Sequence, residues 1–427
     1  EAPGNTVVHG WILDKNEKID EVLVSVYRSP RSYTGEDSAD ISCHGGIATV
    51  QGVMRVLHRA GFRDSLPGEF TFRAFISGKL DLTRAESVME LVSAKTDQAR
   101  THAVNRLSGS LEQEVLSIRN QLVQVLAGTE IFLDYAEDEF TGTPDALDDE
   151  AAGRLPDRAL LEEALARLRA LAKSYRMERL YHEGALVVIA GRPNAGKSSL
   201  FNRLLKEDRS IVTDIPGTTR DWIEGWISME GIPIRLVDTA GIREAEPGGD
   251  IEKLGMERSR ELLKDADLVL HVVDGSCRSE TGDGMRFFPD FLPGDPKRIL
   301  LVRNKIDLCS PGAMPEQGEG SSMRISAKTG WGIPELASAI AARLTLEIGG
   351  KEALGTSSGI GTERQKGLIS VAIQNLEEAL TLADQGEPLD LIAPLLGEGV
   401  NALGEITGEV STADMLEVMF SRFCVGK

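Results

Sequence analysis

Residues 184–200 read Gly-Ala-Leu-Val-Val-Ile-Ala-Gly-Arg-Pro-Asn-Ala-Gly-Lys-Ser-Ser-Leu, and this stretch decides the fold of the central part of the chain. Its run Leu186–Ala190 is apolar on both faces, as expected for a parallel strand covered by helices. Gly191–Ser198 then fits the pattern G-x-x-x-x-G-K-S, in which backbone N–H groups surround a β-phosphate. Lys197 can reach the β and γ oxygens, and the Ser198 hydroxyl can bind Mg²⁺. Strand, loop and helix together predict a nucleotide-binding P-loop.

Four further motifs follow the P-loop in the order expected of a GTP-binding domain. Thr219, in the run Gly217–Asp221, can supply a switch hydroxyl to Mg²⁺, and Asp238 opens Asp-Thr-Ala-Gly and is predicted to bind Mg²⁺ through water. Asn304–Asp307 and Ser326–Lys328 come later. The predicted GTP-binding residues are Asn194, Ala195, Gly196, Lys197, Ser198, Ser199, Thr213, Thr218, Thr219, Asp238, Gly241, Asn304, Lys305, Asp307, Ser326, Ala327 and Lys328.

Asp307 predicts selectivity for guanine. Its carboxylate can accept hydrogen bonds from both guanine N1–H and the 2-amino group. Adenine offers neither donor and would leave a buried carboxylate unpaired, at a cost of roughly 1–3 kcal/mol or more. The five motifs therefore predict a GTPase rather than an ATPase.

Ile242 stands directly after Asp-Thr-Ala-Gly, where Ras-like enzymes have a water-orienting glutamine. An isoleucine cannot orient a water, so hydrolysis needs another group. The candidates are carboxylates of the following loop, although a solvated loop carboxylate is the more frequent role for any single one of them. These candidates are Glu244, Glu246, Asp250, Glu252 and Glu257.

Outward from the P-loop, similar apolar runs recur at Ile234–Val237, Leu268–Val273 and Ile299–Val302, with helical stretches between them. This alternation predicts a doubly wound, Ras-like α/β domain over residues 184–347. Residues 1–82 alternate short apolar runs with turn signals and predict a smaller α/β domain. In 83–183 and 348–427 apolar residues recur at three- and four-residue steps, which predicts amphipathic helices. The expected architecture is multidomain α/β plus α, with the GTPase domain inserted into one helical domain.

The composition argues against a general nucleic-acid-binding protein. The chain has 427 residues, 41% hydrophobic and 27% charged, with a formal net charge of −20. This charge repels nucleic acid, and an aromatic content of 5% leaves few stacking platforms. Any RNA contact must therefore come from a local basic face or a partner. For the densest basic stretch we favour a solvated helix face over an RNA contact; it contains Arg158, Arg167, Arg169, Lys173, Arg176 and Arg179.

The cysteines, the lack of a long apolar run and the N-terminal residues together predict a cytoplasmic protein. Cys43, Cys277, Cys309 and Cys424 show neither a CxxC motif nor metal-ligand spacing, so we expect reduced thiols. No apolar run approaches the ~18 residues of a membrane span. The chain starts with Glu1 rather than Met and without a signal peptide, so we expect that N-terminal residues are missing.

Across nearly its whole length the sequence resembles the MnmE (TrmE) family of tRNA-modification GTPases. The GTPase region matches in Gly191–Ser199, Gly217–Asp221 and Asp238–Glu244. The N-terminal region matches in Ser32–Asp37, Cys43–Gly46 and Pro67–Thr71. The last five residues, Phe-Cys-Val-Gly-Lys, resemble the family's C-terminal signature, with Val where Ile is common.

The resemblance implies a homodimeric GTPase stimulated by K⁺, in which two G domains meet face to face. It implies that the Asn194 side chain binds K⁺ together with backbone carbonyls of Thr213, Ile215 and Thr218. The family's water-positioning glutamate aligns with Glu252. The implied catalytic residues are therefore Glu252, Asn194 and Lys197.

The resemblance also implies that the N-terminal domain binds tetrahydrofolate. In the family, this same domain forms the dimer. The ligand would be 5-formyl- or methylene-tetrahydrofolate, and the matching residues are Asp40, Lys79 and Lys427. The family usually has Glu at the position of Asp40. Cys424 would lie near this site, either as a reactive thiol or as an inert one.

The implied function is a modification of the wobble uridine (position 34) of certain tRNAs. The group added at C5 is of the carboxymethylaminomethyl type. The implied partners are tRNA and the FAD-dependent protein MnmG (GidA). One alternative is a ribosome-assembly or signalling GTPase that acts as a nucleotide-dependent binding switch. Another is a folate-dependent methyltransferase with a vestigial G domain, which we disfavour because every nucleotide motif is intact.

Overall fold

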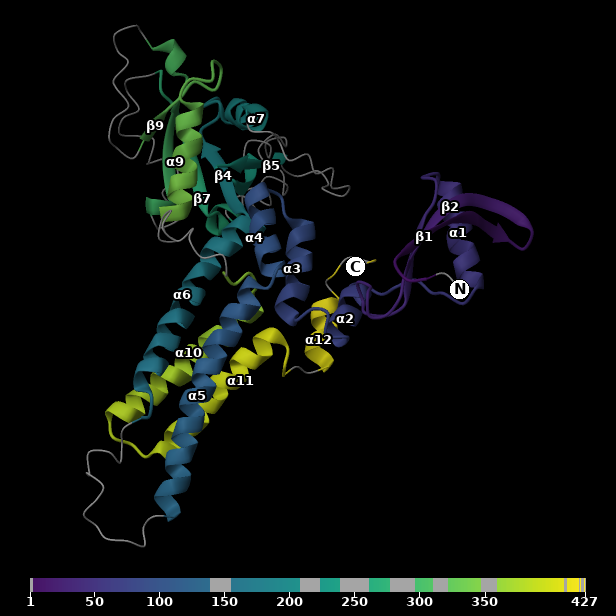
Figure 1. Ribbon diagram of the computed structural model, residues 1–427. Helices are drawn as coiled ribbons and strands as arrows, with labels where there is room; N and C mark the ends of the chain where they lie inside the picture. The colour runs from purple at the N-terminus through teal and green to yellow at the C-terminus, as the bar shows by residue number, and fades with distance from the viewer. Residues whose placement is uncertain are drawn as a thin grey trace, which may run out of the picture. The chain divides into compact units, whose positions relative to one another are not determined.

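The structure is a computed structural model, and the residues it describes are 3–138, 155–207, 223–238, 261–276, 296–309, 322–346, 359–410, 413–421, 423 and 426. The chain forms two compact units, whose helices and strands are labelled in Figure 1. The first unit contains residues 1–92, 104–169 and 363–427, and the second contains residues 93–103 and 170–362. Each unit is therefore assembled from separate parts of the chain.

The second unit is built on a six-stranded sheet with the order β5-β6-β4-β7-β8-β9. The strands are β4 (Ala185–Gly191), β5 (Ile223–Met229), β6 (Ile232–Asp238), β7 (Leu268–Asp274), β8 (Ile299–Asn304) and β9 (Ser322–Arg324). β5 pairs antiparallel with β6, and the other pairs are parallel. All four apolar runs identified in the sequence form strands of this sheet, so the predicted parallel α/β architecture is confirmed.

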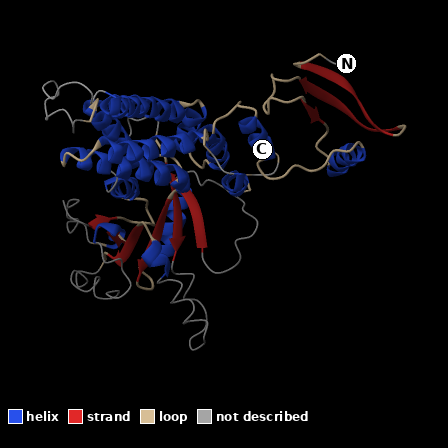
Figure 2. Cartoon of the chain, turned by 90° about the horizontal axis from the view of Figure 1, so that it is seen from below, coloured by secondary structure: helices blue, strands red, loops and turns tan. Residues whose placement is uncertain are grey.

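Helices cover both faces of this sheet, which is why its strands are apolar throughout (Figure 2). On one face, Ile189 and Leu270 pack with residues of α7 (Lys197–Glu207), α9 (Ile333–Leu346) and the end of α6 (Arg158–Glu183). On the other face, Val188 and Val269 pack with Leu263. Two short 3₁₀ helices, η4 (Pro296–Arg298) and η5 (Ile306–Leu308), flank β8. The carboxyl ends of the parallel strands remain available for a ligand.

Residues Ser93–Ala103 pack against the β5–β6 hairpin although they lie far upstream of it in sequence. The Lys95 Nζ lies 3.1 Å from the centroid of the Trp226 ring, which gives a cation–π contact. Burial, together with nearby Arg235, lowers the pKa of Lys95. Gly231 has a φ of +83°, and a Cβ there would overlap the Gln98 side chain. This segment is therefore an integral part of the second unit.

In the first unit, β1 (Thr6–Asp14), β2 (Glu17–Tyr27) and β3 (Ser38–Ser42) form an antiparallel sheet in sequential order. Val24 of β2 lies opposite Val8 of β1 and Ile41 of β3, which fixes the register. Two helices follow, α1 (Ile47–Arg59) and α2 (Glu69–Ile76). The smaller α/β region predicted from the sequence is thus present.

The first unit also contains α3 (Leu82–Ser93), α4 (Asp97–Leu107), α5 (Ser110–Asp138), α10 (Glu363–Asp384), α11 (Leu389–Thr407) and α12 (Ala413–Phe420). The last residue of α3 and the start of α4 belong to the second unit, and the part of α6 up to Arg169 belongs to the first. α11 packs against both α5 and α10. On α5, Leu111, Val115, Ile118, Leu122 and Val125 are fully buried, as their spacing predicts.

The end of the chain packs against α2 and α3. Phe420 and Phe423 are buried with Leu82, and the Phe420 ring meets the Phe72 ring edge-on with centroids 5.2 Å apart. Gly68 has a φ of +67°, and a Cβ there would lie 2.8 Å from the Cβ of Phe423. The glycine of Pro67-Gly68-Glu69 therefore lets the C-terminal segment approach closely.

Candidate nucleotide site

The P-loop joins the carboxyl end of β4 to the first turn of α7. Gly196 has a φ of +91°, and a Cβ at this position would overlap the Asn304 side-chain amide. Asn194 also adopts a left-handed conformation, with a φ of +64°, which asparagine tolerates better than most residues. The buried Lys197 donates from Nζ to the Arg192 carbonyl at 3.0 Å. The loop is thus curled as a phosphate-binding turn requires.

Ser198 and Asp238, both predicted to hold Mg²⁺, are brought into direct contact. The Ser198 Oγ donates to Asp238 Oδ2 at 2.8 Å, from the first turn of α7 to the last residue of β6. The Asp238 side chain is fully buried. Both groups offer oxygen, the ligand atom that Mg²⁺ prefers, so the donor set fits this ion.

The guanine motif is tied to the P-loop through Asn304. Its Nδ2 donates to the Ala195 carbonyl at 3.0 Å, and its Oδ1 accepts from the Ala327 N–H at 3.0 Å. The Asp307 Oδ1 accepts from the Ser326 hydroxyl at 2.6 Å. Motifs about 130 residues apart in sequence are therefore joined at one end of the sheet.

Asp274 is a member of this site that was not predicted from the sequence. Its Oδ2 accepts from Lys305 Nζ at 2.8 Å, and its Oδ1 accepts from Ser276 N–H at 2.9 Å. Burial acts to raise the pKa of Asp274, but the bonds from Lys305 and Ser276 outweigh it and lower the pKa. The available signal was its position, since it directly follows the apolar run Leu268–Val273 at the carboxyl end of a strand beside β4.

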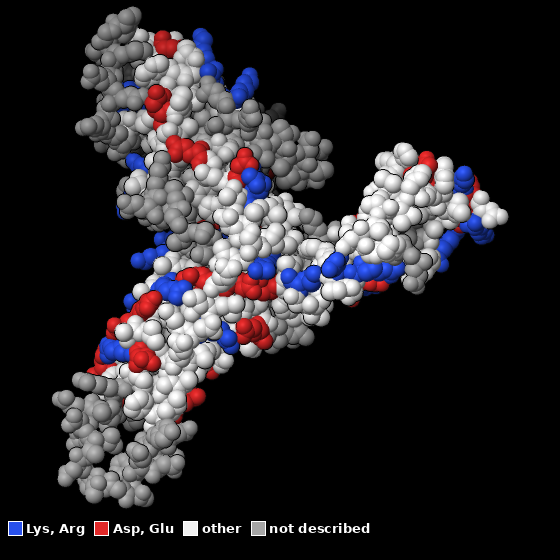
Figure 3. Space-filling view, viewed as in Figure 1, with Lys and Arg blue, Asp and Glu red and all other residues white. Residues whose placement is uncertain are grey.

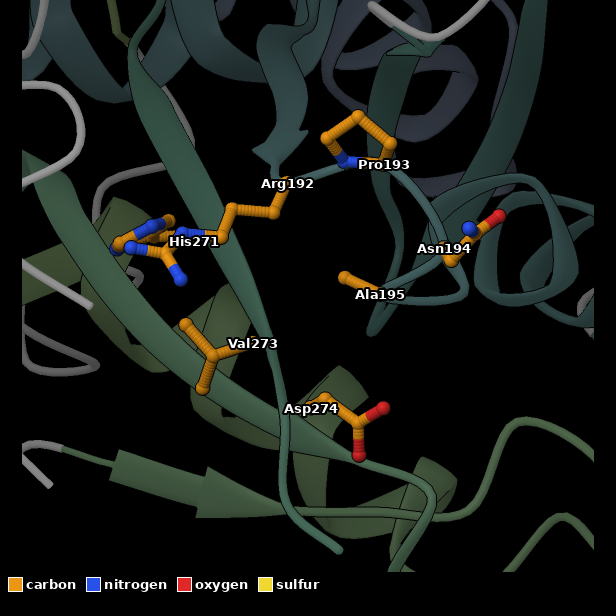
Figure 4. A pocket seen from close by; sticks show the side chains of 7 residues that line it. All are labelled: Arg192, Pro193, Asn194, Ala195, His271, Val273 and Asp274. Carbon is orange, nitrogen blue, oxygen red and sulfur yellow. The ribbon is translucent and has the colours of Figure 1, made fainter. Parts of the chain in front are cut away.

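A pocket of about 140 Å³ lies beside the P-loop (Figure 4). Figure 4 shows Arg192 extending toward His271, and Asp274 at the end of its strand. Burial, with a smaller effect of Arg192, lowers the pKa of His271 and so favours the neutral imidazole. The pocket is lined by Arg192, Pro193, Asn194, Ala195, His271, Val273 and Asp274.

Several predicted site residues lie outside the described residues. Of the nucleotide set, Ser199 and Lys328 are described and exposed. The predicted residues outside the description are Thr213, Ile215, Thr218, Thr219, Gly241, Glu252, Cys424 and Lys427, together with the carboxylates Glu244, Glu246, Asp250 and Glu257. Their roles remain predictions.

Comparison with known proteins identifies the family. The family model of the MnmE helical domain matches residues 82–424 of the sequence, and the family model of the GTP-binding protein TrmE N-terminus matches residues 1–79. Three relatives are each described as tRNA modification GTPase MnmE. The proteins from Treponema denticola, Carboxydothermus hydrogenoformans and Borrelia recurrentis are 42%, 41% and 39% identical, over 100% of this chain and 90% of each relative. The chain belongs to the MnmE family of tRNA modification GTPases. It is accordingly a GTP hydrolase, and the motifs described above are its candidate nucleotide site.

Two of the three residues predicted to bind folate, Asp40 and Lys79, lie among the described residues. Asp40 lies on β3 with an exposed side chain, and Lys79 follows α2 and donates from Nζ to the Pro30 carbonyl at 2.8 Å. The third, Lys427, lies outside the description. A cavity of about 720 Å³, within the size range of small-molecule sites, is lined by residues of β2, β3, α1, α2 and the segments between them. Neither Asp40 nor Lys79 lines this cavity.

Four of the six basic residues identified on α6 form ion pairs within the protein. Arg158 pairs with Glu162 and Asp384, and the first unit's Arg167 and Arg169 pair with Glu114 and Glu377. In the second unit, Arg179 pairs with Glu183. Figure 3 shows basic and acidic side chains intermixed on the visible face. These pairs favour the solvated helix face over an RNA contact. None of the described helices is both long and apolar enough to cross a membrane.

Proposed function

We propose that this protein is a K⁺-stimulated, Mg²⁺-dependent GTPase that acts as a homodimer. With the FAD-dependent partner MnmG, it takes part in modifying C5 of the wobble uridine of certain tRNAs, and the added carbon comes from a reduced folate. The GTPase cycle opens and closes a pair of G domains and gates this chemistry. tRNA is bound jointly with the partner, because the chain itself carries a net charge of −20.

The observation that carries the GTPase part is the contact set at the carboxyl ends of β4, β6 and β8. Asn304 links the P-loop to the segment after β9, while Ser198 meets Asp238. In this arrangement Lys197 and Ser198 hold the phosphates and Asp307 selects guanine. Membership of the MnmE family supports tRNA as the macromolecular substrate.

Stimulation by K⁺ is supported by the position and conformation of Asn194. Its exposed amide lies in the P-loop, and the chain has Ile242 where other GTPases have glutamine. When bound, the ion would offset the negative charge that develops between the β and γ phosphates. An arginine finger gives on the order of 10³–10⁵ in rate, which corresponds to about 4–7 kcal/mol. Asn194 and its neighbouring loop must help to supply a similar amount.

The decisive experiment compares GTP turnover in K⁺ and Na⁺ at several protein concentrations. The proposal expects turnover per protomer to be higher in K⁺ and to rise with protein concentration, because two G domains must meet. Equal turnover in both salts, independent of concentration, would exclude the ion and the G-domain pairing together.

The folate part has its own test. Titration calorimetry with 5-formyl-tetrahydrofolate should show binding that weakens at least tenfold when Lys427 is deleted, because the ligand carries a negative glutamate tail. Unchanged affinity would remove Lys427 from the site. The tRNA part is tested by mass spectrometry of the wobble uridine in cells that lack the gene and in cells complemented with it.

A further inference from the structure

The ion pair between Asp274 and Lys305 joins two strand ends at the nucleotide site. Asp274 is the last residue of β7, and Lys305 directly follows β8. Lys305 lies between Asn304, which contacts the P-loop, and Asp307, the predicted guanine acceptor. A shift of the backbone at Lys305 would therefore move the guanine motif relative to the P-loop.

The surroundings hold both partners in place. Lys305 has a φ of +65°, a conformation that a lysine adopts only when neighbouring contacts support it. The N–H of Gly275 donates to the Asn304 carbonyl at 2.7 Å, directly beside the ion pair. The Ser276 N–H and hydroxyl both donate to Asp274 Oδ1, so Ser276 holds one carboxylate oxygen while Lys305 contacts the other.

We propose that Asp274 is a positioning residue for nucleotide binding, which acts through Lys305 to hold Asn304–Asp307 in register with the P-loop. The Asp274 side chain is 29% exposed and the Lys305 side chain is 30% exposed. Because both are partly shielded from water, we expect the pair to stabilise the site more than a fully exposed surface ion pair would. Because the guanine base is common to GTP and GDP, loss of Asp274 weakens both nucleotides equally. The phosphate groups are held by other residues, so the chemical step is affected far less.

The first test measures dissociation of fluorescent GDP and of a fluorescent, slowly hydrolysed GTP analogue by stopped flow. Asp274→Asn keeps the shape and removes the charge, and it should raise both dissociation rates by about 5- to 30-fold. KM for GTP should rise by a similar factor, while kcat at saturating GTP should change less than twofold. Asp265→Asn, an exposed carboxylate in the same unit, is the control and should leave all rates unchanged.

The second test asks whether Asp274 acts through Lys305. Lys305→Met should also speed dissociation, and adding Asp274→Asn to it should cause less than a twofold further change. The preference for GTP over inosine triphosphate, which lacks the 2-amino group, should stay intact in Asp274→Asn because Asp307 is untouched. It should collapse in Asp307→Asn.

Three outcomes would overturn the proposal. The first is an unchanged dissociation rate in Asp274→Asn. The second is a double variant whose dissociation rate rises by the product of the two single increases, which would mean that Asp274 and Lys305 act independently. The third is loss of guanine preference in Asp274→Asn, which would make Asp274 a direct contact to the base. The melting temperature of each variant, measured without nucleotide, separates these results from simple unfolding.

Discussion

At the residue scale, Gly196 shows how one missing side chain makes the nucleotide site possible. Replacement by alanine would place a methyl group against the Asn304 amide and strain a backbone with a φ of +91°. We expect Gly196→Ala to lower the free energy of unfolding by about 1–3 kcal/mol and to weaken GTP binding at least tenfold, because Asn304 would lose its bond to Ala195. Urea unfolding and fluorescent-nucleotide titration measure the two effects.

The matched control for this substitution is Gly367→Ala. Gly367 is an exposed residue inside α10, and a Cβ there meets nothing within 4 Å. Because alanine is the better helix former, we expect it to stabilise the protein by about 0.5–1 kcal/mol without changing nucleotide affinity. Tight GTP binding by Gly196→Ala would show that the Asn304 contact is dispensable.

The role of Asn194 also needs a substitution that respects its backbone. Since its φ is +64°, Asn194→Ala would combine loss of the amide with strain, whereas Asn194→Gly removes the amide alone. We expect Asn194→Gly to bind GTP within about threefold of the parent but to lose at least tenfold in K⁺-stimulated turnover. A K⁺ titration of turnover is the measurement. An undiminished K⁺ response would mean that the ion is held elsewhere or has no role.

At the element scale, the start of α2 carries an acid-sensitive cluster. Glu69 accepts from Arg63 and from the Leu66 N–H, and also from Arg73, and these bonds lower its pKa to about 2. Because the pKa in the folded state lies below the ordinary value of 4.5, the stabilisation is fully present above pH 4.5 and is lost as the pH falls toward 2. Glu69→Gln should therefore flatten the pH dependence of unfolding free energy between pH 4.5 and pH 2. A slope equal to that of the parent would assign the acid sensitivity to other carboxyl groups.

The buried Glu86 and its partner Arg364 connect three helices of the first unit. Glu86 of α3 accepts from Arg364 Nε at 2.8 Å and Nη2 at 2.9 Å, and from the Gln365 amide at 2.6 Å. Arg364 of α10 also donates to the Glu405 carbonyl of α11 at 2.8 Å. Because Glu86→Ala leaves Arg364 without its counter-charge in a shielded place, we expect a loss of about 3–5 kcal/mol in unfolding free energy. Glu398→Ala, on the exposed face of α11, should change it by less than about 0.5 kcal/mol. Similar losses in both variants would show that the network is unimportant.

At the scale of the whole molecule, local patterns predicted the parts whose geometry is encoded locally. The strands β4, β6, β7 and β8 were predictable because a strand buried on both faces has few polar positions. The P-loop was predictable because glycines recur where another group must come close to the backbone. Gly196 is an example, since a Cβ there would overlap the Asn304 side chain. The fully buried face of α5 followed from its apolar spacing.

The features that escaped prediction depend on tertiary contact. Asp274 carries no motif, and its importance appears only when β7 and β8 lie side by side. The apolar periodicity from Val88 to Leu126 does not reveal the break between α3 and α4, where Lys95 lies over Trp226. Asp40 and Lys79 were identified by resemblance alone, since an exposed Asp and Lys carry no local signal.

The assembly of each unit from distant segments also sets the order in which the protein can be completed during synthesis. The backbone passes between the units at 92/93, 103/104, 169/170 and 362/363. All residues of the GTPase unit have left the ribosome soon after Thr362 is made, whereas α5 must wait for α11 before its buried face is covered. A nascent chain halted shortly after Thr362 emerges should therefore already bind GTP while its first unit still exposes apolar helices, and chaperones should be needed mainly in that interval.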